Sequence, residues 1–492
     1  MKYYIILLFA VLAIVLATTI VISRQKKQKA IDADQFLTGR STARWHQVGF
    51  SVLAVVMGSW ALFSPAEAAM MNGISAAIGY AVAQGIAIAI FAVLGVKLRN
   101  TIPNGSSMTE FVRARFGNGV YYAAMAVSVL YMSAAFVAAL TGIGMAASYT
   151  WGIPGWLAVF TLTAGIIAIV LYGGMRSSLF SDKVQAIVII PTLIIVFVAI
   201  VSYLGGFSFI SQAAAAADSS MMDLGNTFGW EYSLALVLAI GFAGLFDQSY
   251  WQRTYAADSD TSVRKGFIMA SLCLMPLLFM CGLLGVFAVG AGTIKNQSIA
   301  IFELMHQYAP AWLFALLLLL TVCLVVSTCG ALVNAISSVI SVEIKRHKKN
   351  IESKNLIFLT RVIALFVAVV AAIVALFEFS VLYVFLIADL FCAAAGFPIF
   401  FGLYKRRLPG WAALVAMLAG IISGAFFFPD PTFATGNLLH AFALAAGVPI
   451  VICLIFQRAG QPVDLKALNE KIIIVREEDE AIARDMESSK KS

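Results

Sequence analysis

Charged residues are scarce in this chain, since Asp, Glu, Lys and Arg make up only 12% of its 492 residues. A soluble chain of this length would have about 25% charged residues and would divide into several domains. The sequence also lacks a Gly-rich loop that ends in Gly-Lys-Ser or Gly-Lys-Thr, which argues against a pump with its own ATP-driven motor. The six cysteines and four histidines have no metal-like spacing, so we expect neither a resident cofactor nor a metal enzyme.

Long hydrophobic runs take the place of the missing charges. Residues of the hydrophobic classes make up 61% of the chain, and runs of about 20 of them recur, each long enough to cross roughly 30 Å of hydrocarbon. The sequence therefore predicts an all-α polytopic membrane protein with about thirteen transmembrane helices. We expect them approximately at Tyr3–Ile22, Gln47–Met70, Ala76–Val96, Val120–Ser148, Trp156–Leu171, Val184–Leu204, Trp230–Trp251, Phe267–Val289, Pro310–Ser341, Leu356–Phe377, Val381–Leu403, Trp411–Phe427 and Leu438–Ile455.

The distribution of Lys and Arg predicts how the chain is oriented. If the N-terminus is outside, only Lys2 and Lys295 of the 33 basic residues fall on the external side, as the positive-inside rule requires. We therefore expect a multi-pass protein of the cell membrane with a cytoplasmic C-terminus. The formal charge of +8 is explained by this bias, so no nucleic acid is expected as a partner, and no obligate protein partner is evident. The first run could instead be a signal peptide, but its basic cluster follows the apolar stretch and no clear cleavage site is present.

Two of the predicted spans are interrupted by polar and helix-breaking residues. One reads VVMGSWALFSPAEAAMMNG and the other AIGFAGLFDQSYWQR, and they lie five spans apart. An odd number of spans reverses the direction across the membrane, so the pattern predicts a five-plus-five inverted repeat with broken helices near a midplane site. Ordinary kinked helices are the alternative, since Gly and Pro are common in membrane spans.

This reading divides the chain into six parts. They are an extra N-terminal helix with its loop (1–35), the first repeat (36–206), an external loop (207–227), the second repeat (228–403), two C-terminal helices (404–457) and a cytoplasmic tail (458–492). The segment SSMTEFVRARFG between two spans carries a capping box, Ser107 with Glu110, and a terminal Gly117, and predicts a short cytoplasmic surface helix.

Polar side chains inside the spans are candidates for function because they are costly in hydrocarbon. Ser327 and Thr328 are adjacent at the middle of one span, about 100° apart on a helix, and could border one gap as cation ligands. The alternative is that each hydroxyl bonds to its own helix one turn earlier. Four acids also lie in or at the ends of spans: Glu67, Asp182, Asp247 and Asp389.

These acids have different expected roles. Asp182 is at the mouth of a span, where a helix-start role is an alternative to an ion path. Glu67 could cap the second half of a broken helix. Asp389 has no sequence partner and is a candidate for a proton or ion path.

Several motifs in order carry a family resemblance. GRS, MGSW, YGGMRSSLFSDKVQ, FDQSYWQRTYAA and VVSTCGALVN follow one another between about Phe36 and Leu403, and the arrangement resembles the sodium:solute symporter family. The resemblance implies a thirteen-span form of the five-plus-five fold, of the amino-acid/sodium symporter type. It also implies a sodium site built from the carbonyls of Ala54, Met57 and Leu324 with the hydroxyls of Ser327 and Thr328. Asp182 would then release sodium or contribute to a second ion site.

The substrate residues implied by the resemblance are less specific. Proline-transporting members have an aspartate where this chain has Val56 and a serine at Gly58, and sugar-transporting members have a glutamine at Ala61, so both solutes are disfavoured. WALFSPAEAA, SSMTEFVRARFG and FDQSYWQRTYAA look more like the urea and polyamine branch. Its site would combine acids, amides and indoles, each of which could equally be a packing residue. The candidates are Ser59, Trp60, Glu67, Gln84, Asp247, Gln248 and Trp251.

The sequence thus predicts a transporter, not an enzyme: a sodium-coupled symporter that imports a small organic solute, with a urea-like amide or an amine favoured. Its partners would be that solute, Na⁺ and the lipid bilayer. Coupling to protons through Asp389 or Glu67, with an amino acid or other small solute, is an alternative. A passive channel needs no cation site and is a second one, and a solute sensor without coupled flux is a third.

Overall fold

The computed structural model describes residues 40–472 except residues 106, 173–174, 348–352 and 471. The predicted first span and most of the tail lie outside the described residues. Within the described part, eight helices are long and apolar enough to cross a membrane, and shorter apolar helices accompany them. The chain is therefore an all-α multi-pass membrane protein, and the total of about thirteen spans stays a prediction.

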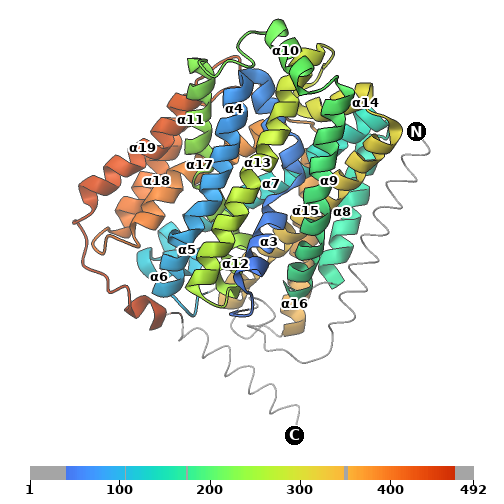
Figure 1. The fold of residues 1–492 in the computed structure, drawn as a ribbon. Helices are drawn as coiled ribbons and strands as arrows, with labels where there is room; N and C mark the ends of the chain where they lie inside the picture. The colour runs from blue at the N-terminus through green and yellow to red at the C-terminus, as the bar shows by residue number, and fades with distance from the viewer. Residues whose placement is uncertain (1–39, 106, 173–174, 348–352, 471, 473–492) are drawn as a thin grey trace.

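The helices run roughly side by side in one bundle (Figure 1). The part of the chain predicted as the first repeat contains α3 (Trp45–Val56), η1 (Ser59–Leu62), α4 (Ser64–Ala89), η2 (Ile90–Ala92), α5 (Leu94–Thr101), α7 (Asn118–Trp151), α8 (Gly155–Tyr172) and α9 (Met175–Tyr203). The part predicted as the second repeat contains α11 (Thr227–Ile240), η3 (Ala243–Phe246), α12 (Gln248–Ala256), α13 (Asp260–Ala291), α15 (Ala311–His347), α16 (Ser353–Ala375) and α17 (Val381–Phe401), and α18 (Gly410–Ala425) and α19 (Leu438–Phe456) follow.

Three short α-helices and one 3₁₀ turn lie in the connections. The predicted capping box is confirmed: α6 (Met108–Phe116) has Ser107 as its N-cap, bonded reciprocally with Glu110, and ends at Gly117 with φ +83°. Buried Arg115 of α6 donates to the carbonyls of Gly402, Lys405 and Leu408 in the connection that follows α17, and burial lowers its pKa to about 10. The sequence did not predict α10 (Phe207–Ala217), which lies within the expected loop 207–227, or η4 (Gln297–Ile299) and α14 (Ala300–Tyr308).

Helix α4 packs closely against α13 and α11. A side chain at Gly285 of α13 would lie 2.0 Å from the Ala66 carbonyl oxygen, and one at Gly79 of α4 would lie 2.3 Å from the Ser233 side chain of α11. Lipid offers no hydrophobic drive for the association of membrane helices, so they depend on close van der Waals packing, which small residues allow. Gly73 kinks α4 with φ +76°, and the N–H of Ile74 is satisfied by the Met221 carbonyl at 2.8 Å.

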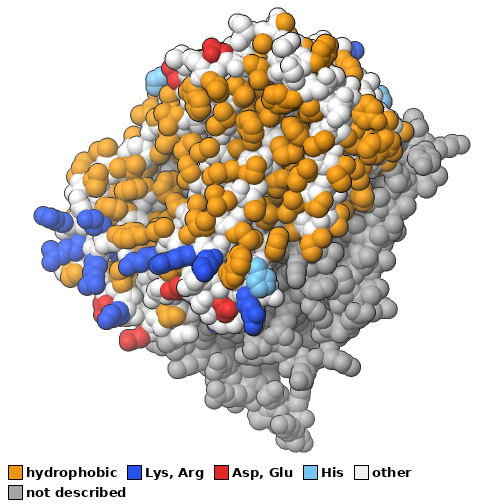
Figure 2. All heavy atoms as spheres, in the orientation of Figure 1, with side chains coloured by type: hydrophobic (Ala, Val, Ile, Leu, Met, Phe, Trp, Pro, Cys, Tyr) orange, Lys and Arg blue, Asp and Glu red, His pale blue; other side chains and the backbone are white. Residues whose placement is uncertain are grey.

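The surface has the pattern of a membrane protein. Figure 2 shows hydrophobic side chains across the middle of one face, with Lys and Arg gathered along its lower edge. In Figure 1 the same edge holds α5, α6 and α12. An apolar belt bounded by basic residues fits a protein that crosses a bilayer.

Candidate functional site

Both predicted interruptions are broken helices, and they share one layout. Helix α3 ends at Val56 and α11 ends at Ile240; after two intervening residues a four-residue 3₁₀ turn begins in each case, η1 and η3. One further residue, Phe63 or Asp247, then precedes the second helical half, α4 or α12. The repetition in two segments so far apart supports the inverted repeat, whose paired breaks face each other at the middle of such folds.

The first break releases two backbone carbonyls. In an uninterrupted helix the N–H of Gly58 would bond to the carbonyl of Ala54, but here it donates to Val56 O at 2.8 Å. The N–H of Ala61 likewise donates to Gly58 O at 3.1 Å and not to Met57 O. The carbonyls of Ala54 and Met57 therefore lack their helical partners. The last carbonyls of any helix lack such partners and need other groups to satisfy them.

The hydroxyls of Ser327 and Thr328 on α15 are also unpartnered. Both oxygens are buried, and neither has a hydrogen-bond partner in the part of the chain that the structure describes. By contrast, Thr321 on the same helix donates to the Leu317 carbonyl at 2.7 Å, which is the bond that a structural hydroxyl makes. Ser327 and Thr328 do not make it, although a buried unpaired hydroxyl costs about 1–3 kcal/mol.

The Thr328 hydroxyl lies at the first break. Helix α15 contacts both α3 and η1, and a Cβ at Gly58 would be 3.0 Å from Oγ1 of Thr328 and 2.5 Å from Cδ1 of Trp60. The Leu324 carbonyl is one turn before Thr328 on α15. Hydroxyl and carbonyl oxygens are the ligands of hard cations, so the donor set fits an alkali ion such as Na⁺. The Asp182 side chain lies outside the described residues.

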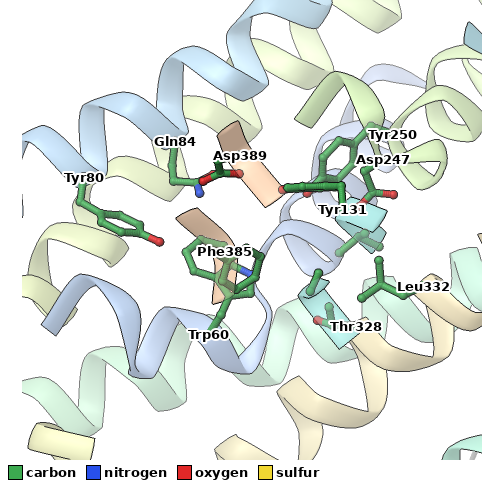
Figure 3. Close-up of a pocket in the computed structure, with 12 residues that line it drawn as sticks. Trp60, Tyr80, Gln84, Tyr131, Asp247, Tyr250, Thr328, Leu332, Phe385 and Asp389 are labelled. Atoms are coloured by element: carbon green, nitrogen blue, oxygen red, sulfur yellow. The ribbon is translucent and has the colours of Figure 1, made fainter. Parts of the chain in front are cut away.

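A cavity lies between the two breaks. Its volume is only about 30 Å³, enough for ordered water, so a solute can enter only when the surrounding helices move apart. Figure 3 shows its side chains, from both repeats, turned towards one space. It is lined by Val55, Trp60, Tyr80, Gln84, Tyr131, Ala135, Asp247, Tyr250, Thr328, Leu332, Phe385 and Asp389. Five of these are aromatic, two are acids, and none of the described lining residues is Lys, Arg or His.

The structure places the predicted substrate residues in two groups. Trp60, Gln84 and Asp247 line the cavity, together with Asp389, which the sequence assigned to an ion path. Thr328, predicted as a sodium ligand, lines it as well, so the candidate cation site adjoins the candidate solute site. The other four predicted substrate residues do not line it: Ser59, Glu67, Gln248 and Trp251.

Those four side chains are buried in other surroundings. The Trp251 indole donates to Leu245 O at 2.7 Å and stacks on Phe400 with ring centroids 6.0 Å apart, so it packs the second break. Gln248 is buried at the start of α12. The Ser59 hydroxyl is buried in η1 without a hydrogen-bond partner among the described residues.

Glu67 holds other helices together instead of capping its own. Its Oε1 accepts hydrogen bonds from the hydroxyls of Ser298 in η4, at 2.9 Å, and of Ser380, at 2.7 Å. Ser380 is the N-cap of α17, whereas α4 has no side-chain cap. The expectation that Glu67 caps the second half of the broken helix is wrong, because its carboxylate is directed towards a neighbouring helix N-terminus.

The opposite side of the first break is tied to α12. The N–H groups of Thr42 and Ala43 both donate to Ala256 O at 2.9 Å, and the N–H of Asp258 donates to Ala43 O at 2.9 Å. We call residues 41–43 with residues 255–258 the strap. Hydrogen bonds from the hydroxyls of Ser262 and Ser259 lower the pKa of Asp258, so it is ionised at neutral pH.

Buried Arg253 joins the same two helices. Its Nε donates to Oγ of Ser51 on α3 at 3.0 Å, and its guanidinium also bonds to Ser249 O at 2.7 Å. The strap and Arg253 hold the ends of α3 and α12 together below the breaks.

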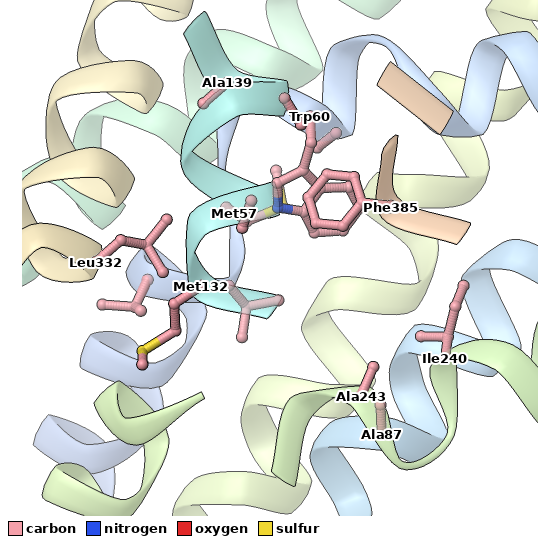
Figure 4. Packing of buried hydrophobic residues seen from close by; sticks show 14 of the residues in the cluster. Met57, Trp60, Ala87, Met132, Ala139, Ile240, Ala243, Leu332 and Phe385 are labelled. Atoms are coloured by element: carbon pink, nitrogen blue, oxygen red, sulfur yellow. The ribbon is translucent and has the colours of Figure 1, made fainter. Parts of the chain in front are cut away.

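Sequence reasoning missed the aromatic lining of the cavity. Tyr80, Tyr131, Tyr250 and Phe385 were not candidates, although Tyr250 is inside the motif FDQSYWQRTYAA. Aromatic residues in apolar spans resemble packing residues, so only their shared cavity distinguishes them. Figure 4 shows Trp60 and Phe385 packed together beside Met57 at the first break.

Comparisons with known proteins agree with this architecture. The chain is 28% identical over 402 residues to the spermidine transporter DUR31 of Candida albicans, covering 80% of this chain and 74% of that protein. It is 25% identical over 502 residues to the urea active transporter of Saccharomyces cerevisiae, covering 88% of this chain but only 66% of that protein. It is also 27% identical over 307 residues to the sodium/glucose cotransporter of Vibrio parahaemolyticus, covering 58% of this chain and 54% of that protein.

The fold is shared with a solved transporter. The structure of a Na⁺-coupled sialic acid symporter in a substrate-bound outward-open state matches with a TM-score of 0.75 at 17% identity, over 93% of this chain and 99% of that one. At this identity the likeness shows the fold alone. The model of the sodium:solute symporter family matches residues 35–420, a stretch that contains both broken helices and α15. The chain therefore belongs to the sodium:solute symporter family.

Proposed function

We propose that the protein is a sodium-coupled secondary symporter that imports a small organic solute, a urea-like amide or an amine, by alternating access. The observation that carries sodium coupling is the pair of unpartnered hydroxyls, Ser327 and Thr328, on a helix that contacts α3 and η1, where the first break releases two carbonyls. A cation there would satisfy groups that are otherwise buried without partners. Ala54, Met57, Leu324, Ser327 and Thr328 would supply its oxygens.

Sodium would act by joining two parts of the bundle. Its ligands come from α3 with its break and from α15, so binding would favour the arrangement in which these elements touch. Thr328 lines the solute cavity, which allows the two bound species to influence one another directly. One sodium ion moving down the membrane potential supplies about 2.3 kcal/mol per 100 mV for concentrating the solute.

Alternating access requires contacts that break on each side in turn. The strap and the bond of Arg253 to Ser51 join the two broken helices on one side, which the basic residues predict to be cytoplasmic. Glu67 joins α4 to η4 and α17 on the other side. We expect the strap to separate when the site opens inward and the Glu67 contacts to separate when it opens outward. We also propose the cell membrane as the location, with the N-terminus outside.

The solute class follows from the cavity and from the relatives. Similar proteins are named as spermidine and urea transporters, and the cavity combines aromatic faces, a glutamine amide and two carboxylates without a basic residue among its described lining. Such a lining favours neutral amides and cationic amines and disfavours anions, because an anion would face two acids.

Proton coupling is a second candidate. A rice relative, 23% identical over 277 residues, is named a urea-proton symporter, and the buried carboxylate of Asp389 lines the cavity. A proton on Asp389 would remove the cost of an unpaired buried charge. The hydroxyl pair on α15 would then need another explanation, which is why we favour sodium.

Uptake into proteoliposomes tests the proposal. The full chain is reconstituted and supplied with radiolabelled urea or spermidine under an inward sodium gradient, an inward proton gradient or neither. We expect accumulation above equilibrium only with the sodium gradient, and its loss when a sodium ionophore is added. Accumulation driven by protons alone would contradict sodium coupling, and equilibration that ignores every gradient would indicate a passive facilitator.

A further inference from the structure

The two acids of the cavity have different surroundings. Asp247 is the N-cap of α12, and its carboxylate accepts the N–H of Ser249 at 2.8 Å. Arg253 lies on the same helix close enough to interact with it electrostatically. A helix N-terminus and a guanidinium both stabilise a negative charge, so Asp247 has its compensation within the protein.

Asp389 has no such compensation. It lies on α17 with only 3% of its surface exposed, and among the described residues none donates a hydrogen bond to it. No described Lys, Arg or His lines the cavity that it faces. An ionised carboxylate that is buried without a partner is strongly disfavoured, so its environment is incomplete until a cation arrives.

The groups around Asp389 suit an organic cation better than a metal ion. Phe385 is one turn earlier on α17, and its ring centroid is 5.9 Å from that of Trp60 and 6.5 Å from that of Tyr131. The Trp60 and Tyr80 rings follow at 6.2 Å. Aromatic faces attract alkylammonium groups through their π-electrons, whereas a dehydrated alkali ion needs a shell of oxygens.

In Figure 3 Asp389 lies among these rings, and Thr328, on α15, lies in another part of the cavity. The candidate sodium oxygens and the uncompensated carboxylate therefore belong to different parts of one site. An ion on α15 would leave the need of Asp389 for a cation unmet.

We propose that Asp389 is the specificity-determining residue of the solute site and holds a protonated amine of the transported solute. A primary ammonium would pair with the carboxylate while its alkyl chain lies against Trp60, Tyr80 and Phe385. A neutral amide such as urea would leave the charge of Asp389 unpaired, so the site discriminates against it. This inference rests on the proposed function and narrows its solute class to amines.

Binding to the purified full chain in nanodiscs tests it, with spermidine and urea as probes at neutral pH and fixed sodium. We expect wild type to bind spermidine more tightly than urea. Asp389→Asn keeps the size of the side chain and removes its charge, and it should weaken spermidine binding at least about 30-fold while urea binding is unchanged or tighter. Asp389→Glu restores the charge and should recover most of the spermidine affinity.

Glu67→Gln is the matched control, because it removes another buried carboxylate, one that lies outside the cavity. It should leave the ratio of spermidine to urea affinity at the wild-type value. If Asp389→Asn fails to fold, Asp389→Glu alone still tests the proposal, since it must retain the preference for spermidine over urea.

The outcomes separate this inference from the proposed function. Equal loss of both probes in Asp389→Asn, or wild-type preference for urea, would overturn the role of Asp389 while leaving symport intact. Binding is also measured across a range of pH, and if Asp389→Asn removed the pH dependence of binding for both probes, Asp389 would be identified as a proton carrier and the inference would be overturned as well. Wild-type uptake that no ion gradient drives would refute the proposed symport, whatever the ratio of affinities.

Discussion

Replacing Thr328 with valine should stabilise the sodium-free protein and at the same time weaken its binding of sodium. The Thr328 hydroxyl is buried and unpartnered among the described residues, so in sodium-free conditions it destabilises the fold by about 1–3 kcal/mol. Valine keeps the branched shape and removes the unpaired group. Without sodium we therefore expect Thr328→Val to unfold at the same temperature as wild type or at a higher one.

With sodium the same change removes one of five proposed oxygen ligands. A hydrogen bond to a charged group contributes about 1.5–3 kcal/mol, and if a cation ligand contributes on the same scale, the sodium concentration for half-maximal uptake rises about 10- to 150-fold. Sodium should also raise the unfolding temperature of the variant less than that of wild type, because a ligand stabilises the folded protein less when its affinity is lower.

Thr321→Val is the matched control on the same helix. Its hydroxyl already donates to Leu317 O at 2.7 Å, so it is not one of the unpartnered hydroxyls proposed as cation ligands. Its sodium requirement should stay within about a factor of 3 of wild type. Unfolding temperatures with and without sodium, and uptake against sodium concentration, are measured for both variants. An unchanged sodium requirement in Thr328→Val, or a sodium-free destabilisation greater than that of Thr321→Val, would refute the reasoning.

Three further changes test other parts of the structure. Gly58→Ala would place a Cβ 2.5 Å from the Trp60 ring, and we expect proteoliposome uptake to be lost while expression is retained; normal uptake would contradict the close approach. Ala43→Pro removes an N–H that donates to Ala256 in the strap, and the lost hydrogen bond is worth about 0.5–1.5 kcal/mol. The site should therefore open more readily on that side, which would be measured as faster labelling of a single cysteine placed in the cavity. Slower labelling would contradict this. Hydrogen bonds from hydroxyl groups lower the pKa of Asp430, in the loop before α19, to about 2. The contribution of its charge to stability is therefore present above pH 3.8 and is lost only as the pH falls through about 2. Asp430→Asn should leave the pH profile of uptake unchanged near neutrality, and a shifted profile would refute this.

The helices and their breaks could be predicted from short stretches of the sequence. Apolar runs predicted α7, α13, α17 and α19 to within several residues, because crossing a bilayer requires about 20 apolar residues in a row. The stretches VVMGSWALFSPAEAAMMNG and AIGFAGLFDQSYWQR predicted the positions of the two breaks for the same kind of reason, since a helix break depends on the residues at the break itself. The pairing of those breaks then predicted the fold.

The content of the cavity could not be read in this way. A span in a bundle is apolar on nearly every face, so its sequence does not show which side turns inwards. Glu67 and Asp389 are both single acids in apolar helices, yet one is held by Ser298 and Ser380 and the other lines the cavity.

By itself, the sequence determined that this protein crosses the membrane many times, that two crossings are broken, and that paired hydroxyls lie at the middle of a third. These features depend on neighbours along the chain, and hydrocarbon enforces them strongly. Only the tertiary structure decided which acids and aromatic rings share the space between the breaks, because that depends on how helices from distant parts of the chain rotate and pack against one another.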